Sequence, residues 1–256
     1  MTYHLTNNFN TGRTGYYPTV VVVGTGGTGG YVAEYLCRLV YHKTDIILVD
    51  MDWVEEANLV RQNFFPDEIG MFKSEALAKR LSTKYNRPVS YSTRPIEATE
   101  MPIKGLIIGC VDNGPARAEI AKKEETAYWW VDVGNGENYG QILIGNAGYA
   151  EFNEKEQVCY NLPLPTIQRP ELLQQAPPVP QLNCEANTIE QGPTINLVMA
   201  SLTIEVVKQL FRGTCPWMQL LVDMDHGTTK PVMADPGIVK RLIKNKSKYA
   251  VRMRGK

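Results

Sequence analysis

The fold class follows from Val20-Val21-Val22-Val23-Gly24-Thr25-Gly26-Gly27-Thr28-Gly29, where four β-branched residues lead directly into a glycine-rich turn. β-branched residues bounded by glycine predict a buried parallel strand, and the spacing Gly24-x-Gly26-x-x-Gly29 is typical of a strand–turn–helix that holds phosphate. Glycine lets the backbone approach the phosphates, and the next helix points free N–H groups and its positive dipole end at them. The stretch therefore predicts a nucleotide site built on four glycines, Gly24, Gly26, Gly27 and Gly29.

The composition of the chain excludes several classes of protein. Its 256 residues are 43% hydrophobic and 21% charged, as in soluble globular proteins, and 27 basic residues balance 27 acidic ones, so nothing global favours nucleic acid. No segment reaches the roughly 18 uninterrupted apolar residues of a membrane span, and residues 1–10 lack a signal-peptide core. We therefore expect a cytoplasmic enzyme. Five dispersed cysteines without a Cys-x-x-Cys pair indicate neither a disulfide framework nor a four-cysteine zinc site.

Strand and helix patterns alternate through the first two-thirds of the chain, which predicts an α/β fold: a doubly wound, Rossmann-like mixed sheet covered by helices. We expect one domain over residues 1–256, with a nucleotide-binding half at 17–150 and a C-terminal helix and strand at 194–235. Residues 163–193 are rich in proline, glutamine and asparagine and show no apolar period typical of a core element. The stretch 157–193 is therefore predicted to be a long, flexible crossover segment.

An acidic residue follows the second expected strand. Asp50 lies 21 residues after Gly29, where its carboxylate can accept hydrogen bonds from ribose hydroxyls. An acidic strand end that merely faces solvent would not explain this register. The glycines and Asp50 together fit a nicotinamide site as well as an adenylate site.

The residues that follow distinguish these two sites. The motifs read Asp50-x-Asp52-x-Val54-x-x-x-Asn58-x-x-Arg61-Gln62, then Ile69-Gly70-x-x-Lys73, then Cys110-Val111-Asp112-Asn113-x-x-x-Arg117. In the order and the gaps of these motifs the chain resembles the ThiF/MoeB/HesA family, adenylating enzymes related to ubiquitin-activating enzymes. The resemblance covers about residues 17–225. Within the family, the chain is most similar to the ThiF-like group of the plasmid-associated PRTRC system.

This resemblance implies an ATP site. Adenylation joins a carboxylate oxygen to the α-phosphorus of ATP while pyrophosphate leaves, which requires cations around the triphosphate. Arg61 and Lys73 are suited to that task, one as a planar guanidinium and the other as a mobile ammonium. The resemblance gives Asp112 the role of holding Mg²⁺, which prefers one or two carboxylates besides phosphates and water. Asp52 corresponds to the second acidic residue of the family motif.

Each of these assignments has a plainer alternative. Arg61 and Lys73 could be solvated charges on helix faces, although their joint register with the other motif positions argues against it. Asn58 and Gln62 are expected to hydrogen-bond a phosphate or ribose oxygen, but they could be turn and capping residues. Asp112-Asn113 could be the N-cap of the following helix, a role that is compatible with ligand binding.

The cysteines leave one candidate nucleophile. Cys184 lies before the apolar helix expected at 195–211, where some family members form a sulfur link to the activated C-terminus. A thiolate could act there, or Cys184 could be an ordinary thiol, since no histidine or basic residue is near in sequence. Cys37 and Cys110 are expected to pack in the core. Zinc-bearing relatives carry two Cys-x-x-Cys pairs, so structural zinc is not expected here.

The two ends of the chain have open interpretations. Arg13 is the sole arginine before the first strand; it could reach across a dimer interface towards the γ-phosphate, as the resemblance implies, or belong to a solvated terminus. Residues 240–256 carry eight basic and no acidic residues. This tail could be a solvated helix with a frayed end, or a dock for an acidic partner or nucleic acid.

Together these observations predict an ATP- and Mg²⁺-dependent enzyme that adenylates the C-terminal carboxylate of a small β-grasp, ubiquitin-like or sulfur-carrier protein ending in glycine. Transfer to a cysteine could follow, and the resemblance implies a homodimer. Two alternatives remain open. One is a catalytically reduced nucleotide-binding scaffold of the same fold, favoured by the short N-terminus and the missing zinc cysteines. The other is an NAD-dependent oxidoreductase, which leaves Arg61, Lys73 and Asp112 unexplained.

Overall fold

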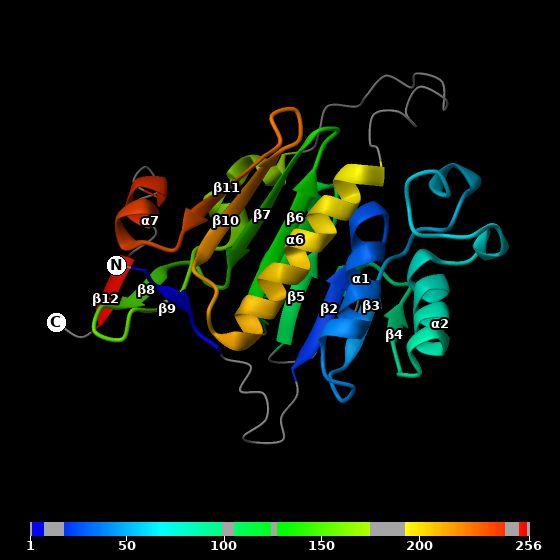
Figure 1. The fold of residues 1–256 in the computed structure, drawn as a ribbon, viewed down its shortest axis with the longest axis horizontal. Helices are drawn as coiled ribbons and strands as arrows, with labels where there is room; N and C mark the ends of the chain where they lie inside the picture. Colours follow the sequence, from blue (N-terminus) through cyan, green and yellow to red (C-terminus); the bar gives the residue numbers. More distant parts are fainter. Residues whose placement is uncertain are drawn as a thin grey trace.

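The computed structural model describes residues 2–7, 18–98, 105–123, 127–174, 193–243 and 251–254. Its main sheet is built from β2 (Thr19–Val23), β3 (Ile46–Val49), β4 (Ser90–Ser92), β5 (Gly105–Gly109), β6 (Ala127–Asn135), β7 (Tyr139–Gly145), β10 (Trp217–Asp223) and β11 (Thr228–Met233). Their spatial order is β11-β10-β7-β6-β5-β2-β3-β4 (Figure 1). The strands from β6 to β4 are parallel, whereas β7, β10 and β11 pair in antiparallel fashion. The predicted doubly wound α/β fold with a mixed sheet is confirmed.

Helices cover both faces of this sheet. They are α1 (Gly27–Leu39), α2 (Lys73–Tyr85), α3 (Gly114–Ala121), α4 (Pro165–Gln168) and α6 (Pro193–Arg212), whereas α7 (Pro236–Ile243) packs against α4 and the second sheet described below. α1 and α6 lie side by side across one face (Figure 1). Met199 of α6 faces Gly140, which pairs with Asn135, whereas Arg117 of α3 faces the neighbouring residue Gly134. Because successive strand residues point to opposite faces, α3 covers the face opposite α6.

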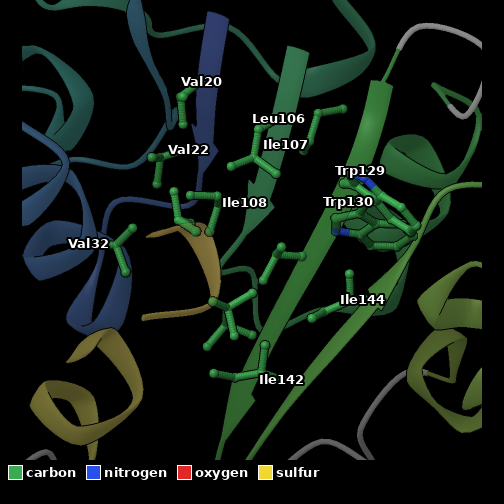
Figure 2. Close-up of a cluster of buried hydrophobic side chains, with 14 of the residues drawn as sticks. Val20, Val22, Val32, Leu106, Ile107, Ile108, Trp129, Trp130, Ile142 and Ile144 are labelled. Atoms are coloured by element: carbon green, nitrogen blue, oxygen red, sulfur yellow. The ribbon is translucent and has the colours of Figure 1, made fainter. Parts of the chain in front are cut away.

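The core lies between these layers. All the valines of β2 are buried, as expected for a parallel strand covered on both sides. Figure 2 shows how side chains of neighbouring strands meet in this cluster, including Val20, Val22, Leu106, Ile108, Ile142 and Ile144. Burial of such side chains contributes roughly 1.5–3 kcal/mol each. This core fixes the strand ends that carry the site.

A second, four-stranded sheet has the order β1-β9-β8-β12, where the strands are β1 (His4–Leu5), β8 (Ala150–Asn153), β9 (Val158–Asn161) and β12 (Val251–Arg254). β12 pairs in parallel with β8, and Arg254 makes hydrogen bonds of 2.7 and 3.1 Å to the two carboxylate oxygens of Glu151. The prediction of a frayed basic end is therefore wrong for residues 251–254, because backbone pairing and this ion pair order them.

The predicted crossover segment 157–193 is partly ordered. Its first half contains β9, α4 and the 3₁₀ turn η4 (Pro170–Leu173). Leu164 and Ile167 are buried, and Gln168 Nε2 donates to the carbonyls of Ile144 and Pro163 at 2.8 and 2.7 Å. The sequence predicts no core element in residues 163–193. This prediction is wrong up to residue 174, because two buried apolar side chains and one hydrogen-bonded glutamine are enough to order a single helical turn. Residues 175–192 lie outside the described residues.

Other differences are smaller. α3 ends at Ala121, and β11 and the short strands of the second sheet have no signal in the sequence that would predict them. Among the described residues α6 alone has the length and mean hydropathy, 1.3, of a membrane span. It packs against α1 and the sheet, which accounts for its apolar composition.

Candidate functional site

A cavity of about 1190 Å³ opens at the carboxyl ends of β2, β3, β5 and β6, the edge where open α/β sheets bind ligands. It is lined by most of the residues expected from the sequence, namely Gly24, Gly26, Gly27, Asp50, Asp52, Asn58, Arg61, Gln62, Lys73, Asp112 and Asn113. Gly29 does not line it. Cys184 and Arg13 lie outside the described residues. The fold thus brings residues from four separate motifs to one cavity.

Some glycines of the turn line the cavity, whereas others allow α1 and the strands to pack closely. Gly24 has φ +83°, and a Cβ there would lie 2.7 Å from the Cys110 carbonyl oxygen. Gly26 is the N-cap of α1, so the first N–H groups of this helix point into the cavity edge. A Cβ on Gly29 would lie only 1.9 Å from the carbonyl oxygen of Gly24. Gly29 therefore permits α1 to pack on β2.

The Asp50 carboxylate fixes the glycine turn through hydrogen bonds. Its Oδ2 accepts hydrogen bonds from the Thr25 backbone N–H at 2.6 Å and the Thr25 hydroxyl at 3.0 Å, and its Oδ1 accepts from the Asp52 N–H at 2.9 Å. Burial raises the pKa of Asp50, while these donors act in the opposite direction. Asp50 therefore both lines the cavity and fixes the turn.

Two cations stand at the other side of the cavity. Lys73 is the first residue of α2, and its Nζ lies 3.2 Å from Asp52 Oδ2. The Lys73 side chain is 10% exposed and that of Asp52 63%, so a solvated helix-face charge does not describe Lys73. Arg61, half-buried, follows the 3₁₀ turn η1 (Glu56–Asn58), with its N–H bonded to the Asn58 carbonyl. Asp52 thus holds the Lys73 ammonium at the cavity wall.

Asn58 and Gln62 differ in how their side chains are engaged. Asn58 Oδ1 accepts from the Glu55 N–H at 3.0 Å and caps η1, so its capping role is real even though it lines the cavity. Gln62 Oε1 is buried and has no hydrogen-bond partner among the described residues. It lies 3.5 Å from where a Cβ on Gly26 would be. Because buried acceptors are rarely left unpaired, Gln62 Oε1 is available to a donor from outside the chain.

Asp112 and Asn113 follow β5. Asn113 Oδ1 accepts from the Ala116 N–H at 2.9 Å, and Asn113 Nδ2 donates to Asp112 Oδ1 at 3.2 Å. Asn113 is thus the N-cap of α3, as the alternative interpretation predicts. Asp112 is exposed and lines the cavity. Within the described residues no cluster of three His, Cys, Asp or Glu side chains could hold a metal, so a cation at Asp112 would need phosphate and water ligands.

A polar cluster at the start of α6 is a part of the site that the sequence did not indicate. Asn196 is buried, and its Oδ1 accepts from the Thr28 hydroxyl at 3.2 Å and from Asn135 Nδ2 at 3.1 Å. Its Nδ2 donates to the Arg61 carbonyl at 3.2 Å. An asparagine in the first turn of an otherwise apolar helix was the available signal. Asn196 connects α6, α1, β6 and the Arg61 loop.

The loop that carries Arg61 and Gln62 is also tied to α1. Asn63 Nδ2 donates to Glu34 Oε2 at 3.0 Å, and Glu34 Oε1 accepts from Lys84 Nζ at 2.6 Å and from the Tyr85 hydroxyl at 2.9 Å. Burial opposes ionisation of Glu34, but these donors outweigh it and lower its pKa to about 2. The loop is therefore held in place without a ligand.

The described cysteines are poor nucleophiles. Burial raises the pKa of Cys37 to about 11 and that of Cys215 to about 12, and it raises those of Cys110 and Cys159 as well. Cys37 is buried, as predicted, whereas Cys110 lies at the cavity wall. The thiolate is the reactive form, so none of these four is activated.

Comparisons with known proteins fit this geometry. "Ubiquitin-like modifier-activating enzyme 5" of Culex quinquefasciatus is 32% identical over 169 residues, covering 58% of this chain and 40% of that protein. The protein of the same name from Drosophila willistoni is 36% identical over 140 residues, covering 47% and 34%. The matched part thus spans less than half the length of these relatives.

Solved structures share the fold. PaaA has a TM-score of 0.60 at 17% identity, covering 84% of this chain and 64% of its own. E. coli MccB, solved with ATP, has a TM-score of 0.59 at 18% identity, covering 84% and 63%. The model of the ThiF family matches residues 17–216, which include the glycine turn and all the motif residues that line the cavity. The chain belongs to the ThiF family.

Proposed function

We propose that the chain is an ATP- and Mg²⁺-dependent enzyme that adenylates the C-terminal carboxylate of a small ubiquitin-like or sulfur-carrier protein. The observation that carries the proposal is the convergence of Arg61, Lys73 and Asp112 on one cavity with the glycine turn. A nicotinamide site has no comparable use for two cations and a carboxylate, whereas transfer at a triphosphate requires them.

The residues present suit ATP. The N-terminus of α1 and its glycines form a cradle for phosphate, and the unpaired acceptor Gln62 Oε1 beside Gly26 can receive a hydroxyl or amino donor from the nucleoside. Asp50 lies where the ribose hydroxyls are expected. The cavity of about 1190 Å³ exceeds the roughly 300–1,000 Å³ of ordinary ligand sites, which supports two reactants in one space.

The chemistry assigned to these residues is electrostatic. A carboxylate oxygen of the carrier attacks the α-phosphorus of ATP, an O–P bond forms, the bond to the β-phosphate breaks, and pyrophosphate leaves. Arg61 and Lys73 would bind the phosphate oxygens on which negative charge accumulates. Asp112 would hold Mg²⁺, which when bound neutralises phosphate charge. Lys73 would then exchange its contact with Asp52 for one with the phosphates.

The second reactant is proposed from the relatives. Those named above are called activating enzymes for a ubiquitin-like modifier, and a structure of E. coli MccB contains the peptide MccA. A carboxylate at the end of a flexible, glycine-terminated tail can enter a cavity already occupied by ATP with little steric conflict. We therefore favour a β-grasp carrier that ends in glycine, and the motif resemblance extends this to the PRTRC group.

Further parts of the proposal rest on the family resemblance. They are a cytoplasmic homodimer with α6 near its interface, Arg13 reaching the γ-phosphate of the partner's site, and Cys184 receiving the activated carboxylate. Light scattering tests the dimer, and a non-reducing gel of enzyme, carrier and ATP tests the adduct. A Cys184→Ala variant should still activate the carrier, because adenylation precedes transfer.

Carrier-dependent exchange of labelled pyrophosphate into ATP tests the adenylation itself. Exchange supports adenylation, because only a reversible adenylate returns the label to ATP. ATP binding without exchange, in the presence of the correct carrier, would instead support the scaffold alternative. Enhanced fluorescence on adding NADH but not ATP would support the oxidoreductase.

Two variants and a matched control locate the activity. Arg61→Ala and Lys73→Ala should each reduce exchange by about 100-fold or more, the usual cost of removing a donor to developing charge. Lys79→Ala is the control, because Lys79 lies on the same helix as Lys73 and makes only a surface ion pair with Glu75. Exchange at the wild-type rate in either cavity variant would refute the phosphate assignment.

A further inference from the structure

Arg117 lines the wall of the cavity and forms a buried ion pair with Asp132, which has no role in the proposed function. Arg117 Nε lies 3.2 Å from each carboxylate oxygen of Asp132, and the two side chains are 7% and 0% exposed. Two charges removed from water gain little net stability from each other, because each loses its hydration. Stability alone therefore does not explain this pair.

The guanidinium has a second attachment, which leads to the Asp112 loop. Arg117 Nη2 donates to the Val111 carbonyl at 2.6 Å, and the Arg117 N–H donates to the Asn113 carbonyl at 3.4 Å. The residues on both sides of Asp112 are thus bonded to residue 117 of α3, Val111 through the guanidinium and Asn113 through the first turn of the helix backbone. Asp132 anchors this arginine to β6.

The packing around the pair depends on Gly109. This residue of β5 is in register with Asp132 of β6. A Cβ on Gly109 would lie 2.9 Å from Trp130 Nε1 and 3.4 Å from Asp132 Oδ1. The missing side chain leaves room for Trp130, and Asp132 lies in contact distance beside it at the end of β5, directly before the loop that carries Asp112.

We propose that Arg117 and Asp132 are positioning residues that direct the Asp112 carboxylate towards the phosphates, an inference that rests on the proposed function. The planar guanidinium bonds Asp132 with one nitrogen and Val111 with another, at a fixed angle between them. A lysine ammonium supplies the charge without that fixed angle. The pair therefore fixes the loop that carries Asp112 relative to β6.

Calorimetric titration of ATP, with Mg²⁺ and with EDTA, tests this. Arg117→Gln should lose 10- to 100-fold of the affinity gained from Mg²⁺, the usual effect of removing a group that orients a metal ligand, and keep its affinity in EDTA. Arg117→Lys should retain thermal stability without restoring that gain. Adding Arg117→Gln to Asp112→Asn should cause no further loss. Lys122→Gln, an exposed position after the same helix, should behave as the wild type.

Two results would overturn the inference. Equal losses with Mg²⁺ and with EDTA would mean that Arg117 contacts the nucleotide or supports the site generally. Full recovery of the gain by Arg117→Lys would mean that the charge suffices.

A measurement without nucleotide separates this inference from the proposed function. Amide hydrogen exchange of residues 110–116 in the unliganded protein should be at least about tenfold faster in Arg117→Gln than in the wild type and in Lys122→Gln, because the side-chain contact with the Val111 carbonyl and the ion pair with Asp132 are lost. Unchanged exchange would refute the positioning role. If the wild type fails to bind ATP, the proposed function fails, while this measurement still decides whether Arg117 holds the loop.

Discussion

Gly29 provides a sharp test of which glycines fold the chain and which bind its ligand. The change to alanine adds one methyl group, whose carbon would lie 1.9 Å from the Gly24 carbonyl oxygen and 3.2 Å from Cys110 Cβ. Contacts under 3.0 Å are essentially never observed for a Cβ, so α1 and β2 must separate by about 1 Å. Both are core elements, and their close packing cannot rearrange freely, so the separation lowers the free energy of unfolding.

The magnitude follows from two opposing effects. Overpacking of a core costs typically about 1–3 kcal/mol, and a collision with a backbone carbonyl belongs at the upper end. Alanine in place of glycine within a helix recovers about 1 kcal/mol. We therefore expect Gly29→Ala to lower the free energy of unfolding by about 2 kcal/mol, or the melting temperature by about 4–8 °C for a domain of this size.

Scanning calorimetry of three variants provides the assay. Gly148→Ala is the matched control, since a Cβ there would meet nothing within 4 Å. Gly26→Ala should lower the melting temperature less than Gly29→Ala, because its Cβ would make only an ordinary 3.5 Å contact with Gln62 Oε1 and its cost is that of alanine at an N-cap, but it should weaken ATP binding. The reasoning is refuted if Gly29→Ala melts within 1 °C of the Gly148→Ala control, a limit of about 0.5 kcal/mol.

Three further predictions concern the polar groups that hold the site. Glu34→Gln should cost about 1–2 kcal/mol at pH 7, less than its pKa near 2 alone would imply because the exposed Lys84 is screened by solvent. Since the pKa is lowered, this stability exists in full above about pH 4.5 and is lost as the pH falls through 2, so the urea midpoints of the two proteins should approach each other below pH 4.5 and converge only near pH 2. Asn58→Ala should cost about 1 kcal/mol through the lost cap, whereas Asn58→Asp should keep its melting temperature and weaken ATP binding by placing a negative charge near the phosphates. Asn196→Leu should cost about 2 kcal/mol by removing the acceptor of Asn135 Nδ2 and the donor to the Arg61 carbonyl, and should weaken ATP binding in a calorimetric titration.

The elements with local signals were predictable. β2 and β5 are continuous apolar runs in parallel strands, and such runs identify buried strands without knowledge of their partners. The short strands were not predictable, because His4–Leu5 and Val251–Arg254 are too short to show a period of two and their pairing partners, β9 and β8, are distant in sequence. Their order is set by tertiary contacts, which local propensity does not register.

For the buried polar groups, too, local signals were predictable and tertiary partners were not. Asp132 occurs within the apolar run Trp129-Trp130-Val131-Asp132-Val133, and a carboxylate in a buried strand requires a partner. The sequence could have indicated that need, but Arg117 was one of many cations that could meet it. The choice depends on α3 packing on the face of β6 that Asp132 occupies, which is a property of the assembled fold.

Capping a helical turn and lining the cavity are joint roles of the same side chains. Asn58 and Asn113 each cap a helical turn and each line the cavity. The reason is geometric: at the carboxyl edge of a parallel sheet every strand turns into a helix, each first turn needs an acceptor, and ligands bind at that same edge. A demonstrated cap is therefore no evidence against a binding role at this edge. Gly29 illustrates the converse, since it belongs to the phosphate motif but touches only the protein, so the role of each motif residue has to be argued from its contacts.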